Sequence, residues 1–158
     1  MIDALQYIGE LGLGSRLKRL SETLMRETNL IYDAYNIDFD PYLFPVFKIL
    51  IDNTCVTTTE LQEQLQYTQP AITQALNKLS NKKLVVYSTD KVDKRKKNFR
   101  LSKKGVELHK ELTPIWQAID QQIKWLTQGS ATNLLHHISY IENQLSKKSL
   151  SKRVLENL

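Results

Sequence analysis

Cysteine and histidine are scarce in this chain. Its 158 residues include one cysteine, Cys55, and three histidines, His109, His136 and His137. A single cysteine cannot form an internal disulfide, and these four residues do not show the spacings at which Cys and His bind zinc. We therefore expect no disulfide, no metal site and no cofactor.

Glycine is also sparse, at five residues, and the sequence contains no glycine-rich loop that could cradle a phosphate. One cysteine and three scattered histidines do not provide a nucleophile, a base and a group to orient them. The composition thus argues against an enzyme.

Long hydrophobic runs are missing as well. No stretch approaches the roughly 18 to 20 apolar residues that a membrane span needs, and the first residues lack the order of a signal peptide. The hydrophobic content of 41% is enough for one buried core. We expect a cytoplasmic protein with one domain and extensions.

Positive charge is present in quantity but is concentrated in one window. Of 22 Lys and Arg residues, 11 lie between Lys78 and Lys104, against only Asp90 and Asp93. This window therefore carries +9, and because the whole chain carries +5, the remainder sums to −4. A polyanion is the natural partner of such a window, and nucleic acid is the first hypothesis.

Two helices are predicted before this window. Apolar residues at spacings of three, four or seven predict a long amphipathic helix from Leu13 to Tyr35. Asp40 followed by Pro41 is typical of an N-cap and a first helical position, so a second helix should run through Ile51.

A helix-turn-helix is predicted next. Thr57 and Glu60 fit a capping box that opens a third helix, and Thr68 should cap a fourth helix that has Pro70 in its first turn. The fourth helix has an apolar stripe and an opposite polar face of Gln, Thr and Asn, whose amides and hydroxyls suit base edges. A merely solvated polar face is the alternative.

A charged hairpin should follow. The runs Leu84 to Tyr87 and Phe99 to Leu101 predict two strands joined by a loop over Asp90 to Asn98. Lys and Arg in this loop suit phosphate neutralisation, and an arginine at its tip could enter a minor groove. Simple solvation of these charges is the alternative.

These features together resemble the MarR family of bacterial transcriptional regulators. The resemblance rests on Thr68-Gln69-Pro70-Ala71-Ile72-Thr73 at the start of the fourth helix, on Asp93-Lys94-Arg95 in the hairpin, and on Leu101-Ser102-Lys103-Lys104-Gly105 after it. It covers nearly the whole chain and implies a winged-helix homodimer in which Arg95 reaches DNA and Asp93 holds that arginine. Two positions depart from the family pattern: Gln74 replaces a frequent Arg, and Asn81-Lys82-Lys83 lacks the usual Gly.

The chain after the hairpin is rich in apolar helical patterns. Ser102 should cap a helix that Pro114 kinks or breaks and Gly129 ends, and another helix should start near Ser130. A small winged-helix core has little surface left to cover, so we expect a dimer interface, with packing inside one subunit as the alternative. The expected interface residues are Leu13, Leu17, Leu20, Leu134, Ile138, Ile141 and Leu145.

Aromatic residues cluster where the first two helices adjoin the predicted DNA-binding unit. In the resembled family ligands often bind at this junction, although for any single residue a place in the core is favoured over a pocket. The candidate pocket residues are Tyr32, Tyr35, Phe39, Tyr42 and Phe47.

The sequence therefore predicts a mostly α fold with a small β-hairpin wing. A winged helix-turn-helix over residues 37–102 would be flanked by dimerisation helices in 1–36 and 103–158. The predicted function is sequence-specific binding of double-stranded DNA by a homodimer, as a repressor that responds to a small molecule and recognises a pseudo-palindromic operator. The alternative is a protein-interaction winged helix with a nonspecific basic face. The predicted DNA contacts are Thr68, Gln69, Pro70, Ala71, Thr73, Gln74, Asn77, Lys78, Lys91, Asp93, Lys94, Arg95, Lys96 and Lys97.

Overall fold

The computed structural model describes residues 3–89, 97–128 and 133–156. The chain forms two compact units, Met1–Glu111 and Leu112–Leu158. The boundary between them falls inside helix α6 (Lys103–Gln128). Each unit is described by itself, and the three-part division expected from the sequence stays a prediction.

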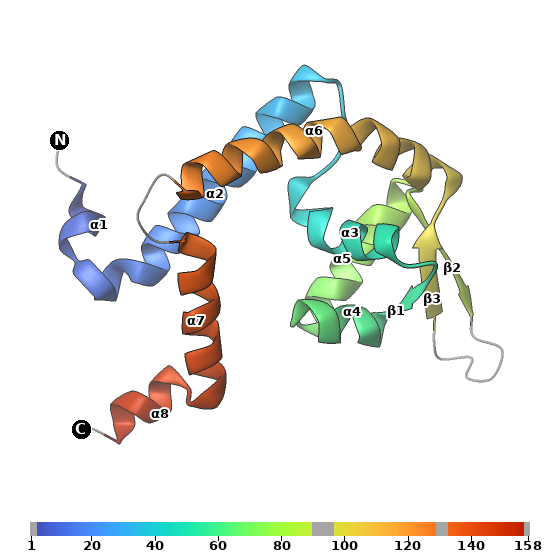
Figure 1. The fold of residues 1–158 in the computed structure, drawn as a ribbon. Coiled ribbons are helices and arrows are strands. Elements are labelled where there is room, and N and C mark those ends of the chain that lie inside the picture. Colours follow the sequence, from blue (N-terminus) through green and yellow to red (C-terminus); the bar gives the residue numbers. More distant parts are fainter. Residues whose placement is uncertain (1–2, 90–96, 129–132, 157–158) are drawn as a thin grey trace. The chain divides into compact units, whose positions relative to one another are not determined.

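The first unit begins with three helical segments, α1 (Ala4–Tyr7), η1 (Gly9–Gly12) and α2 (Leu13–Ala34) (Figure 1). Helix α2 confirms the long amphipathic helix to within one residue at its end. Arg19 on α2 donates two hydrogen bonds to Asp3, at 3.0 and 2.6 Å. This guanidinium lowers the pKa of the Asp3 carboxyl and joins α1 to α2.

The next helix begins later than predicted. Asp40 is an N-cap, and its carboxylate accepts the N–H of Tyr42 at 3.0 Å, but it caps the 3-10 turn η2 (Pro41–Leu43). Helix α3 (Phe44–Asp52) follows. Pro45 explains the delay, because it has no N–H to donate to the Pro41 carbonyl, which instead accepts the Phe44 N–H in the tighter 3-10 pattern.

The predicted helix-turn-helix is present as α4 (Thr58–Leu65) and α5 (Gln69–Asn81). The capping box is confirmed: the Glu60 N–H donates to Thr57 Oγ1 at 3.2 Å, and the Thr57 N–H donates to Glu60 Oε2 at 2.7 Å. Thr68 occupies the N-cap position of α5, but its side chain accepts no capping hydrogen bond, so that prediction is wrong. Pro70 gives the reason, since it removes one of the two N–H groups that a cap can accept.

Three strands form a small antiparallel sheet in the order β1-β3-β2 (Figure 1). Strands β2 (Val85–Thr89) and β3 (Lys97–Leu101) are the predicted hairpin and pair Tyr87 with Phe99. Strand β1 (Val56–Thr57) pairs with β3 and was not predicted, because two residues are too few to show an alternating pattern.

The turn from α5 into β2 depends on a left-handed residue that is not glycine. Lys83, the last residue of the Asn81-Lys82-Lys83 segment, has a φ of 60° and so adopts the left-handed conformation that glycine usually supplies. After the hairpin, Ser102 caps α6 as predicted, by accepting the Gly105 N–H at 3.0 Å. The Ser102 N–H also donates to the Leu84 carbonyl at 2.9 Å, which ties the start of α6 to the start of the hairpin.

The core of the first unit is apolar and includes part of the predicted aromatic cluster. Phe39 lies between Tyr32 and Phe47, with ring centroids 6.0 and 5.1 Å away, and all three are buried. The other buried hydrophobic residues of this unit are Ile37, Leu43, Val46, Leu50, Val56, Leu61, Ile72, Leu76, Leu79, Leu84, Val85 and Phe99. Within the described ranges no charged side chain is buried.

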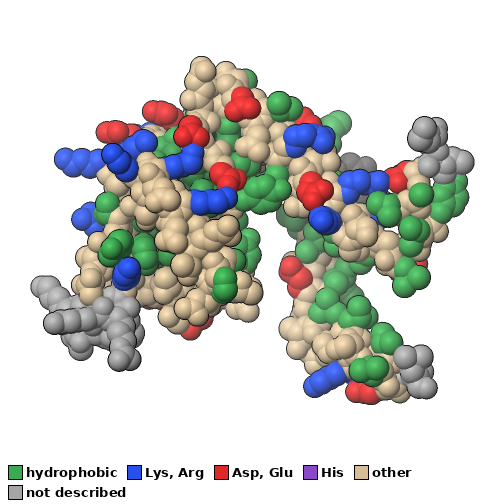
Figure 2. All heavy atoms as spheres, turned by 180° about the vertical axis from the view of Figure 1, so that it is seen from behind, with side chains coloured by type: hydrophobic (Ala, Val, Ile, Leu, Met, Phe, Trp, Pro, Cys, Tyr) green, Lys and Arg blue, Asp and Glu red, His purple; other side chains and the backbone are tan. Residues whose placement is uncertain are grey.

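The second unit contains the rest of α6, then α7 (Leu134–Lys147) and α8 (Leu150–Leu155). Pro114 was predicted to kink or break α6. The helix continues through Pro114, so the break is wrong, because a helix of 26 residues tolerates one lost hydrogen bond; the kink stays a prediction. Helix α7 begins at Leu134, where the Asn133 side chain accepts the N–H groups of Leu135 and His136. The predicted helix end at Gly129 and the predicted start near Ser130 fall outside the described residues. Hydrophobic side chains lie open on α7 and α8 (Figure 2).

Among the described helices none is long and apolar enough to cross a membrane.

One testable consequence concerns Gly105. A Cβ at this position would lie 2.2 Å from the Leu84 carbonyl oxygen, a backbone atom that also accepts from Ser102. We expect Gly105→Ala to lower the free energy of unfolding by about 1 to 3 kcal/mol, measured by urea denaturation. Gly14→Ala in α2 is the control, since its Cβ would meet no atom within 4 Å. Equal stability of the two variants would contradict the close approach at Gly105.

Candidate nucleic-acid interface

Helix α5 has one buried face and one open polar face. Ile72, Leu76 and Leu79 are buried, with Leu76 2% exposed and the other two fully covered. The opposite face lines a shallow hollow of about 540 Å³. The residues around this hollow are Gln69, Pro70, Thr73, Gln74, Asn77, Lys78 and Asn81.

This hollow brings together most of the residues predicted to contact DNA on α5. Gln69, Thr73, Gln74 and Asn77 present amide and hydroxyl groups to solvent from consecutive turns. Amides can pair bidentately with adenine, and hydroxyls can bond to several bases. Asn81 was not among the predicted contacts; it lies seven residues after Gln74 and extends the same face by one turn.

The remaining predicted contacts lie at the ends of this region. Thr68 and Ala71 are exposed around the start of α5. Lys97 is exposed at the start of β3, and its ammonium group lies 4.4 Å from the centre of the Tyr87 ring on β2. This cation–π contact holds a positive charge at the base of the hairpin. The other predicted hairpin contacts lie outside the described residues: Lys91, Asp93, Lys94, Arg95 and Lys96.

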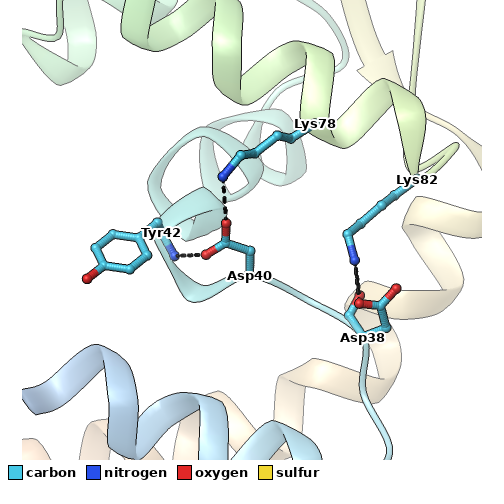
Figure 3. A network of polar contacts seen from close by, with 5 residues as sticks. All are labelled: Asp38, Asp40, Tyr42, Lys78 and Lys82. Atoms are coloured by element: carbon cyan, nitrogen blue, oxygen red, sulfur yellow. Dashed lines mark hydrogen bonds and ion pairs between the residues drawn. The ribbon is translucent and has the colours of Figure 1, made fainter. Parts of the chain in front are cut away.

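Two lysines at the end of α5 form ion pairs that sequence analysis missed (Figure 3). Lys78 donates to Asp40 Oδ2 at 3.0 Å, and Lys82 pairs with Asp38. The Lys82 ammonium group, by its hydrogen bond and its charge, lowers the pKa of the Asp38 carboxyl, and Lys104 adds a smaller effect. These partners are 38 and 44 residues apart in sequence, so no local pattern indicates them.

The predicted ligand pocket is only partly assembled. A hollow of about 680 Å³ lies where the end of α2 meets the segment before η2, and it includes Phe39 and Tyr42. Tyr32 and Phe47 are instead core residues, and Tyr35 is 66% exposed. The rest of the lining is polar and largely acidic: Asn29, Asp33, Asn36, Asp38, Asp40 and Lys82, together with Ile37. The hollow therefore differs from the aromatic pocket that the sequence indicated.

The residues predicted for a dimer interface are mostly open. On α2, Leu13, Leu17 and Leu20 are between 42 and 46% exposed. On α7, Leu134, Ile141 and Leu145 are between 38 and 43% exposed, and Ile138 is half-buried. Apolar residues that recur along one helical face and remain open are typical of a surface that another chain covers.

The described part of the chain has no group of three or more His, Cys, Asp and Glu residues that could hold a metal ion. Cys55 is exposed and forms no disulfide bond.

One protein-family model matches this chain. The family model described as "TFIIE alpha subunit" matches residues 30–125, which is more than half of the chain. Among curated protein sequences, none matches.

Solved structures of MarR-type regulators share the fold. A mutant MarR from E. coli in complex with operator DNA is 21% identical, with a TM-score of 0.67, and the match covers 91% of this chain and 99% of that one. The S. aureus MepR–DNA complex is 20% identical, with a TM-score of 0.64, and covers 85% and 96%. The PcaV regulator from Streptomyces coelicolor, in complex with its natural ligand, is 14% identical, with a TM-score of 0.65, and covers 94% and 99%.

Proposed function

The chain belongs to the family described as the TFIIE alpha subunit and has the winged-helix fold of MarR-type regulators, and from this we propose that it is a sequence-specific, DNA-binding transcriptional regulator. The observation that carries the proposal is the open polar face of α5, with the cationic hairpin after it. Two structures of the same fold are DNA complexes, which supports the same use here.

In this proposal α5 enters the major groove. Base edges are read by Gln69, Thr73, Gln74 and Asn77. At the start of the helix, the sugar-phosphate backbone of the DNA is contacted by Thr68, Pro70 and Ala71. A helix start is suited to this position, because its free N–H groups favour a phosphate.

The hairpin supplies the electrostatic part of the affinity. Lys91, Lys94, Lys96 and Lys97 neutralise phosphates, and Arg95, held by Asp93, reaches DNA beside the α5 contacts. The charge of the 78–104 window makes this strongly salt-dependent.

We further propose a homodimer that places two copies of α5 on a pseudo-palindromic operator. The open apolar residues of α2 and α7 supply the contact between subunits. A dimer binds more tightly than one subunit because the second half-site is engaged at high effective concentration.

Regulation by a small molecule, with repression as the output, completes the proposal. The hollow beside α2 is the candidate site, with Phe39 and Tyr42 as its aromatic members and Tyr32, Tyr35 and Phe47 nearby in sequence. The PcaV complex, whose ligand is natural to it, supports an effector in a protein of this fold. We also propose that the protein is cytoplasmic, because the structures that share its fold are transcriptional regulators.

Two other functions are less well supported. A protein-interaction winged helix would present aromatic anchors, whereas the open face of α5 is built of Gln, Thr, Asn and Lys. An enzyme would need a reactive group oriented by neighbours, and the structures that share this fold are regulators.

The proposal predicts a loss of discrimination when Gln74 is truncated. We expect Gln74→Ala to weaken binding to a selected operator by about 1 to 3 kcal/mol and to leave binding to a random duplex nearly constant. Fluorescence anisotropy on both duplexes measures the difference. If affinity falls equally on the two duplexes, Gln74 instead contacts the DNA backbone or serves in packing.

Substitutions on the apolar face of α7 test the proposed dimer contact. Because Ile141 is 40% exposed and Ile138 is half-buried in one chain, replacing both with Glu should leave that chain folded but put charge into the contact between subunits. We expect the variant to run as a monomer in light scattering and to lose tight operator binding.

The control places two Glu residues on the opposite side of the same helix, at Ser139 and Asn143, which are both exposed. This variant should stay dimeric. A parent protein that is monomeric at micromolar concentration, or an Ile138 and Ile141 variant that stays dimeric, would remove α7 from the interface.

A further inference from the structure

Asp40 has both oxygens of its carboxylate in use. Oδ1 accepts the Tyr42 N–H at 3.0 Å as the cap of η2, and Oδ2 accepts the Lys78 ammonium group at 3.0 Å (Figure 3). The hydrogen bond from the Tyr42 N–H orients the carboxylate independently of Lys78, so the acceptor for the ammonium group is preorganised. The Asp40 side chain is 28% exposed, and that of Lys78 is 51% exposed.

Lys78 both lines the open face of α5 and pairs with Asp40. It helps to line the hollow on the open face of α5, where DNA would lie, while its ammonium group is bonded to a carboxylate from the segment before η2. Lys82, one turn further along, is held in the same way by Asp38 from that segment. Two positive charges at the end of the candidate recognition helix are therefore already compensated inside the protein.

A carboxylate offers a lysine what a DNA phosphate offers, namely a negative charge and oxygen acceptors at hydrogen-bond distance. Binding to DNA of arbitrary sequence depends almost entirely on phosphate contacts. A lysine whose charge is already compensated by an internal carboxylate gains less from contact with a phosphate than a free lysine does. The Asp40–Lys78 pair would therefore oppose binding to DNA of arbitrary sequence.

We propose that Asp40 competes with DNA phosphates for the Lys78 ammonium group and so lowers the affinity of the protein for DNA of arbitrary sequence. The inference rests on the proposed DNA-binding function and assigns to Asp40 the role of lowering nonspecific affinity. Asp40 acts from outside the set of predicted DNA contacts, and it acts through Lys78.

The test is Asp40→Asn in the full-length protein, with a random-sequence duplex as the probe. Asn remains a good N-cap, so the variant keeps the cap of η2 but loses the charge that holds Lys78. We expect binding at low salt to tighten by roughly two- to fivefold, the range that one exposed ion pair supports. The plot of log affinity against log salt should steepen by about 0.9 as one more lysine reaches a phosphate.

The matched control is Asp120→Asn on α6. Asp120 also pairs with a lysine, Lys124, at 2.6 Å, and its replacement changes the net charge by the same amount. It should leave the salt slope unchanged. If Asp40→Asn behaves like this control, the inference is overturned.

A double-mutant cycle separates competition from simple repulsion of DNA by Asp40. With Lys78→Gln in the background, Asp40→Asn should no longer change the slope, because no ammonium group is left to release. An effect that persists without Lys78 would mean repulsion and would overturn competition.

Circular dichroism melts check that each variant is folded, and Asp40→Ser, which is also a capping residue, replaces Asp40→Asn if the latter is unstable. A parent that binds no duplex at any salt concentration would refute the proposed function together with this inference. A parent that binds while neither Asp40 variant tightens binding would refute the inference alone.

Discussion

The burial of one face of α5 is the constraint on which the rest of the structure depends. Ile72, Leu76 and Leu79 fix the rotation of this helix about its axis, because exposing any of them to water would cost about 1.5 to 3 kcal/mol each. Once this rotation is fixed, the side chains between them must face outward. The open Gln, Thr and Asn face is therefore set by packing, and its chemistry can vary without loss of the core.

Charge is distributed differently on the two elements that are proposed to bind DNA. At the end of α5, Lys78 and Lys82 are compensated by Asp40 and Asp38, which come from the segment that follows α2. At the hairpin, Lys97 is held over the ring of Tyr87, a contact that leaves its charge uncompensated. In this account the hairpin supplies general affinity for DNA, and α5 supplies the reading of its sequence.

The sequence predicted those parts of the fold that local chemistry determines. The α2 periodicity, the Thr57–Glu60 capping box and the Ser102 cap are all short-range patterns, and each is present. Three errors concern proline: Pro45 and Pro70 changed the start of a helix in ways that were not expected, and Pro114 did not break α6 as expected. Strand β1 was missed because two residues are too few for a pattern. The ion pairs of Asp38 and Asp40 could not be predicted, because they join residues about 40 positions apart that only the folded chain brings together.

Selection of DNA fragments from a random pool by the full-length protein tests the central claim most directly. If two copies of α5 read DNA in a symmetric dimer, the selected fragments should share an inverted repeat whose half-sites have centres about 10 base pairs apart, or a multiple of that distance. A pool that shows no shared sequence after selection, or one unrepeated half-site, would contradict the account.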